Sequence, residues 1–322
     1  MTADYLKRYT LLEMAIVNIE SLSMRAGGTW ALWDVNLEIG EGEITAIFGR
    51  AGSGKSVLAK IICGLDEPTS GSIFWNGQQN PGCVSIALDK PAFAPDLTVY
   101  ENLDMFASLW RVPKKKRARQ ISFVLELMKL SDYSTIMADR LSTGMLRRFE
   151  IARALIADAP VTIIDSLLDT LDPDILEKLW DHMLSLRRAE MKSFIVMTSR
   201  GKIAEMCPRI AVIHRGRINF LGRPDDFRRL AGEDMVVLGD ITNPSVKSRI
   251  REQLSVVIQE EDGFLSFRVS NGEKMIGNLL AEYGSDLSCV YLKRPTLEDA
   301  LDVVAMGGLK VMADVSEERA GQ

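Results

Sequence analysis

Gly49-Arg50-Ala51-Gly52-Ser53-Gly54-Lys55-Ser56 is the stretch that decides the fold of this chain. It follows the apolar segment Ile44–Phe48 directly and leads into a helical pattern over Ser56–Ile62. The spacing is that of a phosphate-binding loop, G-x-x-x-x-G-K-[ST], in the strand–loop–helix context that the motif requires. Glycines let backbone N–H groups surround the β- and γ-phosphates at a helix N-terminus. All eight residues are therefore predicted to bind a nucleotide, with Lys55 supplying a positive charge.

A second apolar segment, Val161–Ile164, ends in Asp165. In phosphate-loop NTPases a carboxylate at the end of a neighbouring strand helps to hold Mg²⁺, together with the hydroxyl of the loop Ser or Thr. An aspartate that caps a helix after a core strand would look the same, but the preceding phosphate loop favours the metal. We therefore predict Ser56 and Asp165 as Mg²⁺ ligands.

The first 230 or so residues alternate short β-branched segments with longer helical patterns. This alternation predicts an α/β domain with a largely parallel, buried sheet. Residues 98–141 contain no strand pattern, so we expect a helical insertion between two halves of the sheet. The expected strands are Ala15–Glu20, Val35–Ile39, Ile44–Phe48, Val161–Ile164, Phe194–Thr198 and Ile210–Ile213, and the expected helices begin near Gly54, Tyr100, Lys114, Met145, Pro173 and Arg223.

A shift in composition after Gly232 marks a second, smaller α+β domain. Its pattern has the order β-α-β-β-α-β, which is typical of a ferredoxin-like sandwich. The predicted elements are Met235–Leu238, Pro244–Leu254, Val256–Gln259, Phe264–Val269, Gly272–Tyr283 and Ser288–Leu292. The expected organisation is an N-terminal extension (1–14), a nucleotide-binding domain (15–232, helical part about 98–145), the small domain (233–312) and a polar tail (313–322).

Composition excludes several classes of function. The chain has 322 residues, 47% of them hydrophobic, and a net charge of −5, which argues against a nucleic-acid partner. No segment approaches ~18 uninterrupted apolar residues, and the N-terminus lacks the apolar core of a secretory signal. The four cysteines form no C-x-x-C pair and the two histidines have no ligand spacing, so we expect reduced thiols and no structural zinc.

Between the two phosphate motifs, Leu141-Ser142-Thr143-Gly144-Met145 and the following Arg147–Leu155 resemble the LSGGQ signature and signature helix of ATP-binding-cassette (ABC) ATPases. Asp169-Thr170-Leu171-Asp172-Pro173 resembles the D-loop of that family, and His214–Ile218 its late hairpin. The resemblance covers residues 15–230. Arg294–Leu301 resembles the closing element of the antibiotic-export branch, which is a weaker match over one short motif.

The resemblance implies a head-to-tail pair of such domains that sandwich Mg²⁺ and ATP. Ser142, Thr143, Gly144 and Met145 would complete the site of the opposite subunit, and Asp169, Leu171 and Asp172 would form the D-loop. It also implies transmembrane partner subunits and a place on the cytoplasmic face of the cell membrane.

Four positions depart from the family pattern. Ser166 stands where the family has the glutamate that polarises the attacking water, and Thr198 or Ser199 stands where it has a histidine. Asp89 replaces a glutamine that joins Mg²⁺ sensing to the transmembrane contact, so it is a further candidate metal ligand. Ala26 replaces the aromatic residue that stacks on adenine, although Trp30 or Trp33 could partly replace it.

The resemblance implies an exporter subunit, and these departures predict that it binds ATP, hydrolyses it poorly at its own site and pairs with a different, competent ATPase subunit. One alternative is an active homodimeric ATPase that uses another base, Asp169 or Glu150. Another is a nucleotide-gated regulator or scaffold without a transmembrane partner. Whether the chain is itself an enzyme is left open by the sequence, as is the transported substrate.

Overall fold

The computed structural model describes residues 15–76, 84–241, 244–254, 256, 258–261 and 264–305, so the predicted end segments 1–14 and 313–322 lie outside the described residues. Within this range the chain forms two compact units that divide between Pro224 and Asp225. The composition shift places the boundary later, after residue 232. Residues 229–231 form the short helix η4 (Arg229–Ala231), which contacts α11 (Leu297–Ala305) and therefore groups with the second unit.

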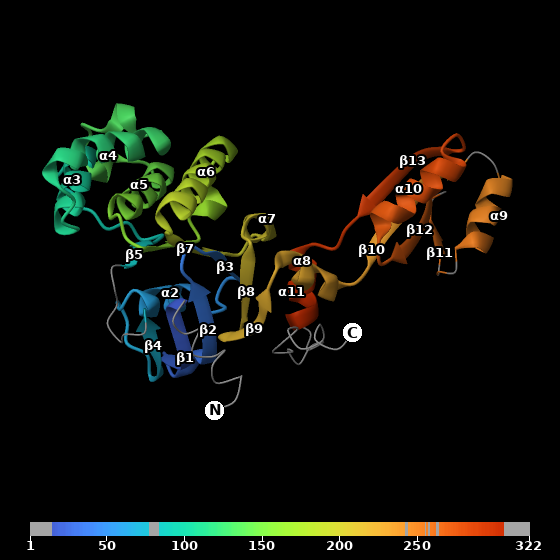
Figure 1. Ribbon diagram of the computed structural model, residues 1–322, viewed down its shortest axis with the longest axis horizontal. Helices are drawn as coiled ribbons and strands as arrows, with labels where there is room; N and C mark the ends of the chain where they lie inside the picture. The colour runs from blue at the N-terminus through green and yellow to red at the C-terminus, as the bar shows by residue number, and fades with distance from the viewer. Residues whose placement is uncertain are drawn as a thin grey trace. The chain divides into compact units, whose positions relative to one another are not determined.

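A six-stranded sheet forms the centre of the first unit (Figure 1). All neighbouring strands pair in parallel except the last, β9, which pairs antiparallel with β8. Three of the strands are buried along their whole length, as expected for a sheet covered on both faces. The predicted largely parallel sheet is confirmed. In spatial order the strands are β5 (Val84–Ala87), β6 (Val161–Asp165), β7 (Ser193–Thr198), β3 (Ile44–Phe48), β8 (Arg209–His214) and β9 (Arg217–Gly222).

Two of the strands that we expected in this sheet belong to a different one. β1 (Ala15–Ala26) and β2 (Thr29–Gly40) pair with each other and with β4 (Ser70–Trp75) in a separate antiparallel sheet. The reason is the turn Gly27–Gly28, where both residues have positive φ, +56° and +83°. Such a two-residue turn joins the strands as a hairpin and makes them antiparallel.

The helix that follows the phosphate loop joins the two sheets into one core. α2 (Lys55–Ile62) contacts both β2 and the parallel strands β6 and β7. Its buried Leu58 and Ile62 belong to one hydrophobic cluster with Leu37 of β2 and Ile163 of β6. The start of α2 is therefore held rigidly beside the ends of the parallel strands.

The insertion between β5 and β6 is helical, as predicted. Thr98 begins it with a capping box, in which its side chain and that of Glu101 each accept from the other's backbone N–H. Helices α3 to α6 lie together (Figure 1). No helix among the described residues is both long and apolar enough to cross a lipid bilayer. The helical elements of the first unit after α2 are α3 (Val99–Leu109), α4 (Lys114–Leu127), η1 (Ser131–Tyr133), η2 (Ala138–Arg140), α5 (Thr143–Ile156), η3 (Leu168–Thr170), α6 (Pro173–Glu190) and α7 (Gly201–Met206), and α8 (Pro224–Arg228) spans the boundary between the units.

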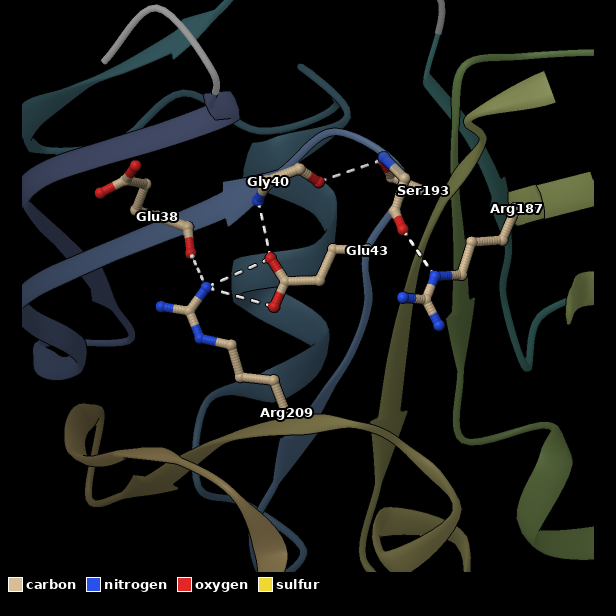
Figure 2. Close-up of polar contacts among 7 residues, drawn as sticks. Glu38, Gly40, Glu43, Arg187, Ser193 and Arg209 are labelled. Atoms are coloured by element: carbon tan, nitrogen blue, oxygen red, sulfur yellow. Dashed lines mark hydrogen bonds and ion pairs between the residues drawn. The ribbon is translucent and has the colours of Figure 1, made fainter. Parts of the chain in front are cut away.

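A polar network fixes the amino ends of the parallel strands (Figure 2). Arg209 Nη1 lies 3.2 Å from both carboxylate oxygens of Glu43 and donates to the carbonyl of Glu38 at 3.1 Å. The Ser193 hydroxyl donates to the carbonyl of Gly40 at 3.2 Å. Since β3, β7 and β8 all begin here, this network aligns the strands whose opposite ends form the site.

The second unit has the predicted β-α-β-β-α-β order. Its four strands pair antiparallel throughout in the spatial order β11-β12-β10-β13, which is the ferredoxin-like arrangement. Its own hydrophobic cluster includes Val236, Leu238, Leu265 and Phe267. The elements are β10 (Asp234–Ile241), α9 (Pro244–Gln253), β11 (Ile258–Glu261), β12 (Phe264–Val269), α10 (Gly272–Tyr283), β13 (Leu287–Lys293) and α11.

Candidate functional site

The candidate site lies where the carboxyl ends of β3, β6 and β7 meet. β3 pairs with β7, and β7 pairs with β6, all in parallel, so the segments that follow them leave the sheet at one edge. This edge is where parallel α/β sheets bind ligands. The residues brought together are the phosphate loop after β3, Asp165 and Ser166 at the end of β6, and Thr198–Arg200 at the end of β7.

Two positions of the phosphate loop require glycine because the backbone there lies against neighbouring segments. A Cβ atom on Gly49 would lie 2.3 Å from the carbonyl oxygen of Ile213. Gly54 has φ of +109° and caps the start of α2, and its Cβ would lie 2.7 Å from the carbonyl of Ala31. The backbone therefore approaches its neighbours closely at both positions, in a path that a side chain would block.

Lys55 is buried at the centre of the loop. Its Nζ donates to the carbonyl oxygens of Gly49 at 2.7 Å and Arg50 at 2.9 Å. Burial lowers the pKa of Lys55, and the carboxylates of Asp165 and Asp169 act against that shift. The ammonium group thus sits near two carboxylates, in a place where a phosphate would supply further negative charge.

The residues present fit a Mg²⁺-nucleotide. The Ser53 hydroxyl is buried and has no hydrogen-bond partner among the described residues. Ser56 is exposed at the first turn of α2, and the Asp165 carboxylate is almost fully buried at the end of β6. These hydroxyl and carboxylate oxygens are the hard donors that Mg²⁺ prefers, since it binds through few protein ligands and substrate phosphates. When bound, the metal would neutralise phosphate charge.

Ser166 occupies the position after Asp165 in an unusual backbone conformation. Its φ is +60°, and its backbone N–H donates to the carbonyl of Met197 at 2.9 Å. Its hydroxyl donates to Asp165 Oδ1 at 3.2 Å. The side chain therefore supports the candidate metal ligand and carries no charge with which to accept a proton.

The Asp169 carboxylate ties η3 to the end of β7. It accepts hydrogen bonds from the Thr198 hydroxyl, from the Ser199 backbone N–H at 3.1 Å and from the Ser199 hydroxyl at 3.2 Å. Arg200 Nη1 also donates to the backbone carbonyl of Asp169. The sequence motifs did not indicate this contact; the one signal for Arg200 was a cation two residues after the end of a buried strand. The neighbouring Asp172 begins α6 as its N-cap.

The signature-like residues form the exposed start of α5. Ser142 is the N-cap of α5, and its Oγ accepts from the Met145 backbone N–H at 3.3 Å. Ser142, Thr143 and Gly144 are all exposed, and a Cβ on Gly144 would meet nothing within 4 Å. This segment is free to contact a ligand or a second molecule.

Asp89 lies in an ion pair with the signature helix. Its Oδ1 is 2.9 Å from Arg147 Nε, with both side chains partly exposed. Glu150, on the same helix, is fully buried; its carboxylate accepts from the Ala92 backbone N–H at 2.7 Å and pairs with Arg153. Burial raises the pKa of Glu150, against the effect of Arg153. The loop that carries Asp89 is thus joined to α5 at two points.

Two exposed tryptophans lie on β2 beside the phosphate loop. The rings of Trp30 and Trp33 meet edge to face with centroids 4.5 Å apart, and Arg25 and Arg217 lie over one ring each. The backbone N–H of Trp33 donates to the carbonyl of Gly216 at 2.8 Å. The intervening Ala31 is the residue whose carbonyl lies against Gly54, so the strand that carries both tryptophans passes next to the loop.

Comparison with known proteins decides the family. Residues 32–168 match the family model described as ABC transporter. The Nod factor export ATP-binding protein I of Rhizobium johnstonii is 31% identical over 221 residues, which cover 66% of this chain and 71% of that relative. The chain belongs to the ABC transporter family. It is an ATP-binding subunit of an ABC transporter.

Other relatives of this ABC subunit carry import names. The sulfate/thiosulfate import ATP-binding protein CysA of Mesostigma viride is 29% identical and aligns over 77% of this chain and 76% of its own length. The methionine import ATP-binding protein MetN of Ralstonia nicotianae is 28% identical, with 89% of this chain and 88% of the relative aligned. The relatives therefore share the family, but their names differ in the direction of transport and in the transported substrate.

Solved structures agree with the ABC fold. The ATP-binding subunit of an ABC transporter superposes with a TM-score of 0.62 at 26% identity, covering 66% of this chain and 92% of that structure. The ATP-binding cassette MJ0796, a dimer in a post-hydrolysis state with ADP and Pi, gives a TM-score of 0.60 at 25% identity, covering 65% and 98%. The predicted phosphate-loop cassette fold is confirmed.

Proposed function

We propose that this ABC subunit binds Mg²⁺-ATP but turns it over slowly at its own phosphate loop. The observation that carries the proposal is Ser166, whose uncharged hydroxyl donates to Asp165 where the family resemblance places a glutamate. A neutral hydroxyl is a poor base near neutral pH, and loss of a general base costs roughly 10²–10⁴-fold in rate. The segment after β7 likewise offers Thr198 and Ser199 in place of an imidazole.

The leading alternative is an active ATPase in which Asp169 or Glu150 is the base. Glu150 is fully buried and is held by the Ala92 N–H and by Arg153, so it has no open path to an attacking water. Asp169 accepts three hydrogen bonds from Thr198 and Ser199, which occupy its oxygens. Both carboxylates are engaged in structural contacts, which favours the slow site.

Nucleotide binding itself has support beyond the loop. Ala26 offers no ring for adenine, but Trp30 and Trp33 are both exposed and lie on either side of Ala31, whose carbonyl is next to Gly54. Stacking of a base on an aromatic side chain is worth roughly 1–3 kcal/mol. We propose that this pair receives the base in place of the missing aromatic residue.

A slow site is useful if a partner subunit supplies a competent one. Ser142, Thr143 and Gly144 are exposed at the start of α5, and the MJ0796 cassette is described as a dimer. We propose a heterodimer in which this segment completes the partner's ATP site, with transmembrane subunits that hold both at the cytoplasmic face of the cell membrane.

Export is the proposed direction of transport, supported by the 31% identity to the Nod factor export protein and by the Arg294–Leu301 motif. A regulator without a transmembrane partner is the remaining alternative.

Calorimetry of ATP binding with and without Mg²⁺ tests the proposal. Wild type should bind, Lys55→Ala should lose binding, and Lys60→Ala, an exposed lysine later on α2, should bind like wild type. Equal affinity of wild type and Lys55→Ala would overturn nucleotide binding at the loop.

A phosphate-release assay on the same proteins separates the slow site from the active alternative. Vigorous turnover that Lys55→Ala and Asp169→Asn both abolish would establish Asp169 as the base and overturn the slow site. Little ATP turnover by wild type that still binds ATP would support the slow site.

A further inference from the structure

The turn between α3 and α4 carries a concentration of positive charge that is absent from the rest of this acidic chain. Residues 109–119, Leu-Trp-Arg-Val-Pro-Lys-Lys-Lys-Arg-Ala-Arg, contain six basic residues and no acidic one, against a net charge of −5 for the whole chain. Lys114, Lys115, Lys116 and Arg119 are exposed, and the described residues provide no ion-pair partner for any of the four. Their charge is therefore open to an external anion.

An exposed apolar side chain lies beside this charge. Leu109, the last residue of α3, is 69% exposed, the largest fraction recorded for a large hydrophobic side chain in the described residues. Trp110 follows it and is half-buried. Since only four residues separate α3 from α4, Leu109 and the lysines lie at the same end of the helix pair.

The turn holds these groups in a fixed place. Val112 is buried, and its N–H donates to the carbonyl of Ala107 at 2.9 Å. Arg117 Nε donates back to the Val112 carbonyl at 2.8 Å. The basic residues are thus presented by an ordered turn.

The lysines lie at the N-terminus of their helix, where positive charge is electrostatically unfavourable. Lys114, Lys115 and Lys116 form the first turn of α4, which contains no acidic residue and has no side-chain cap. A helix N-terminus carries partial positive charge, so cations there are unfavourable. An external anionic surface would relieve this repulsion, which distinguishes the cluster from an ordinary solvated helix face.

We infer that the α3–α4 turn docks on an anionic lipid surface. Clusters of four to eight Lys and Arg attract anionic headgroups, and an adjacent Leu and Trp can enter the boundary between headgroups and acyl chains. An acidic protein segment would satisfy the charge but gives no reason for an exposed leucine beside a tryptophan. The inference goes beyond ATP binding and does not depend on the proposed slow site.

Co-sedimentation of the purified full chain with phosphatidylglycerol vesicles, and with phosphatidylcholine vesicles as reference, tests the inference. Wild type should sediment with the anionic vesicles at low salt and be released by high salt, because the attraction is screened. The triple variant Lys114→Gln/Lys115→Gln/Lys116→Gln should lower the apparent partition coefficient roughly a hundredfold. Leu109→Ser should weaken binding to the anionic vesicles at low salt, because it removes the apolar contact and leaves the charge unchanged.

A matched control removes the same charge elsewhere. Lys178→Gln/Arg188→Gln/Lys202→Gln alters three exposed residues dispersed over α6 and α7 and should bind vesicles like wild type. ATP binding should be unchanged in both triple variants, which confirms folding. Equal vesicle binding by wild type and the Lys114–Lys116 variant would overturn the inference. The inference would also be overturned if wild type did not bind anionic vesicles and the Lys114–Lys116 variant lost binding to protein partners. The turn would then bind an acidic protein.

Discussion

The chemistry of this site depends on hydrogen-bond partners as much as on residue type, as Asp165, Ser166 and Asp169 show. Asp165 and Lys55 could be recognised from their motifs, because each stands at a fixed distance from a buried strand. The contacts of Asp169 with Thr198 and Ser199 join residues about 30 positions apart. Local patterns carry no information about such contacts, which arise only when β6 and β7 become neighbours.

Glu150 provides a prediction at this scale. Glu150→Ala should lower the free energy of unfolding of the first unit by roughly 3–5 kcal/mol, because it leaves the almost buried Arg153 guanidinium without its carboxylate. Glu150→Gln, which can still accept from the Ala92 N–H, should cost less. Denaturant unfolding followed by tryptophan fluorescence measures both. A Glu150→Ala protein within 1 kcal/mol of wild type would contradict the structural role given to this carboxylate.

At the scale of elements, the fully buried strands of the parallel sheet could be predicted, whereas β4 and β5 could not. Ile44–Phe48 and the strands at 161 and 194 are continuous apolar runs, and the structure places them within one residue of the predicted bounds. β4 begins with the polar Ser70–Ser72, and so gives no such signal. The predicted Ala15–Glu20 strand continues to Ala26 through an irregular register and a positive φ at Ser21, features that break the alternation on which strand prediction relies.

The loop that carries Asp89 and helix α5 give a second prediction. The Asp89–Arg147 pair is exposed, so either single substitution should change stability by less than about 1 kcal/mol. If the pair transmits movement of the loop to the signature segment, Asp89→Arg and Arg147→Asp should each reduce ATP turnover of the assembled transporter. The exchanged double variant should recover most of it. A double variant as impaired as the sum of its parents would show that the pair transmits nothing.

For the whole molecule, the order of motifs along the chain predicted a cassette with a ferredoxin-like second domain, and the sheet orders agree. Metal ligation by Asp89 stays a prediction, although the contact with Arg147 gives that carboxylate another role here. Assembly also stays a prediction, because the exposed start of α5 shows what is available for contact and not what covers it.

Assembly yields the third prediction. If Ser142 contacts a phosphate oxygen in a partner's site, that hydrogen bond to a charged group is worth roughly 1.5–3 kcal/mol. Ser142→Arg should therefore lower ATP turnover of the reconstituted transporter roughly ten- to hundredfold. Ser185→Arg, the same change on the exposed face of α6, is the control and should leave turnover unchanged. Unchanged turnover for Ser142→Arg would remove the mechanism from the heterodimer proposal.

The central place of β3 has a consequence for synthesis of the chain. β3 is complete by residue 48, but its two neighbours, β7 and β8, begin only at residues 193 and 209. At roughly 5–20 residues per second, a ribosome needs about 7–30 s to make the first of them. During that interval the emerging chain carries the apolar sequence Ile-Thr-Ala-Ile-Phe without either strand that will flank it. A chain truncated before residue 193 should consequently depend on a chaperone, whereas one released after residue 214 contains both flanking strands and should hold its phosphate loop in place.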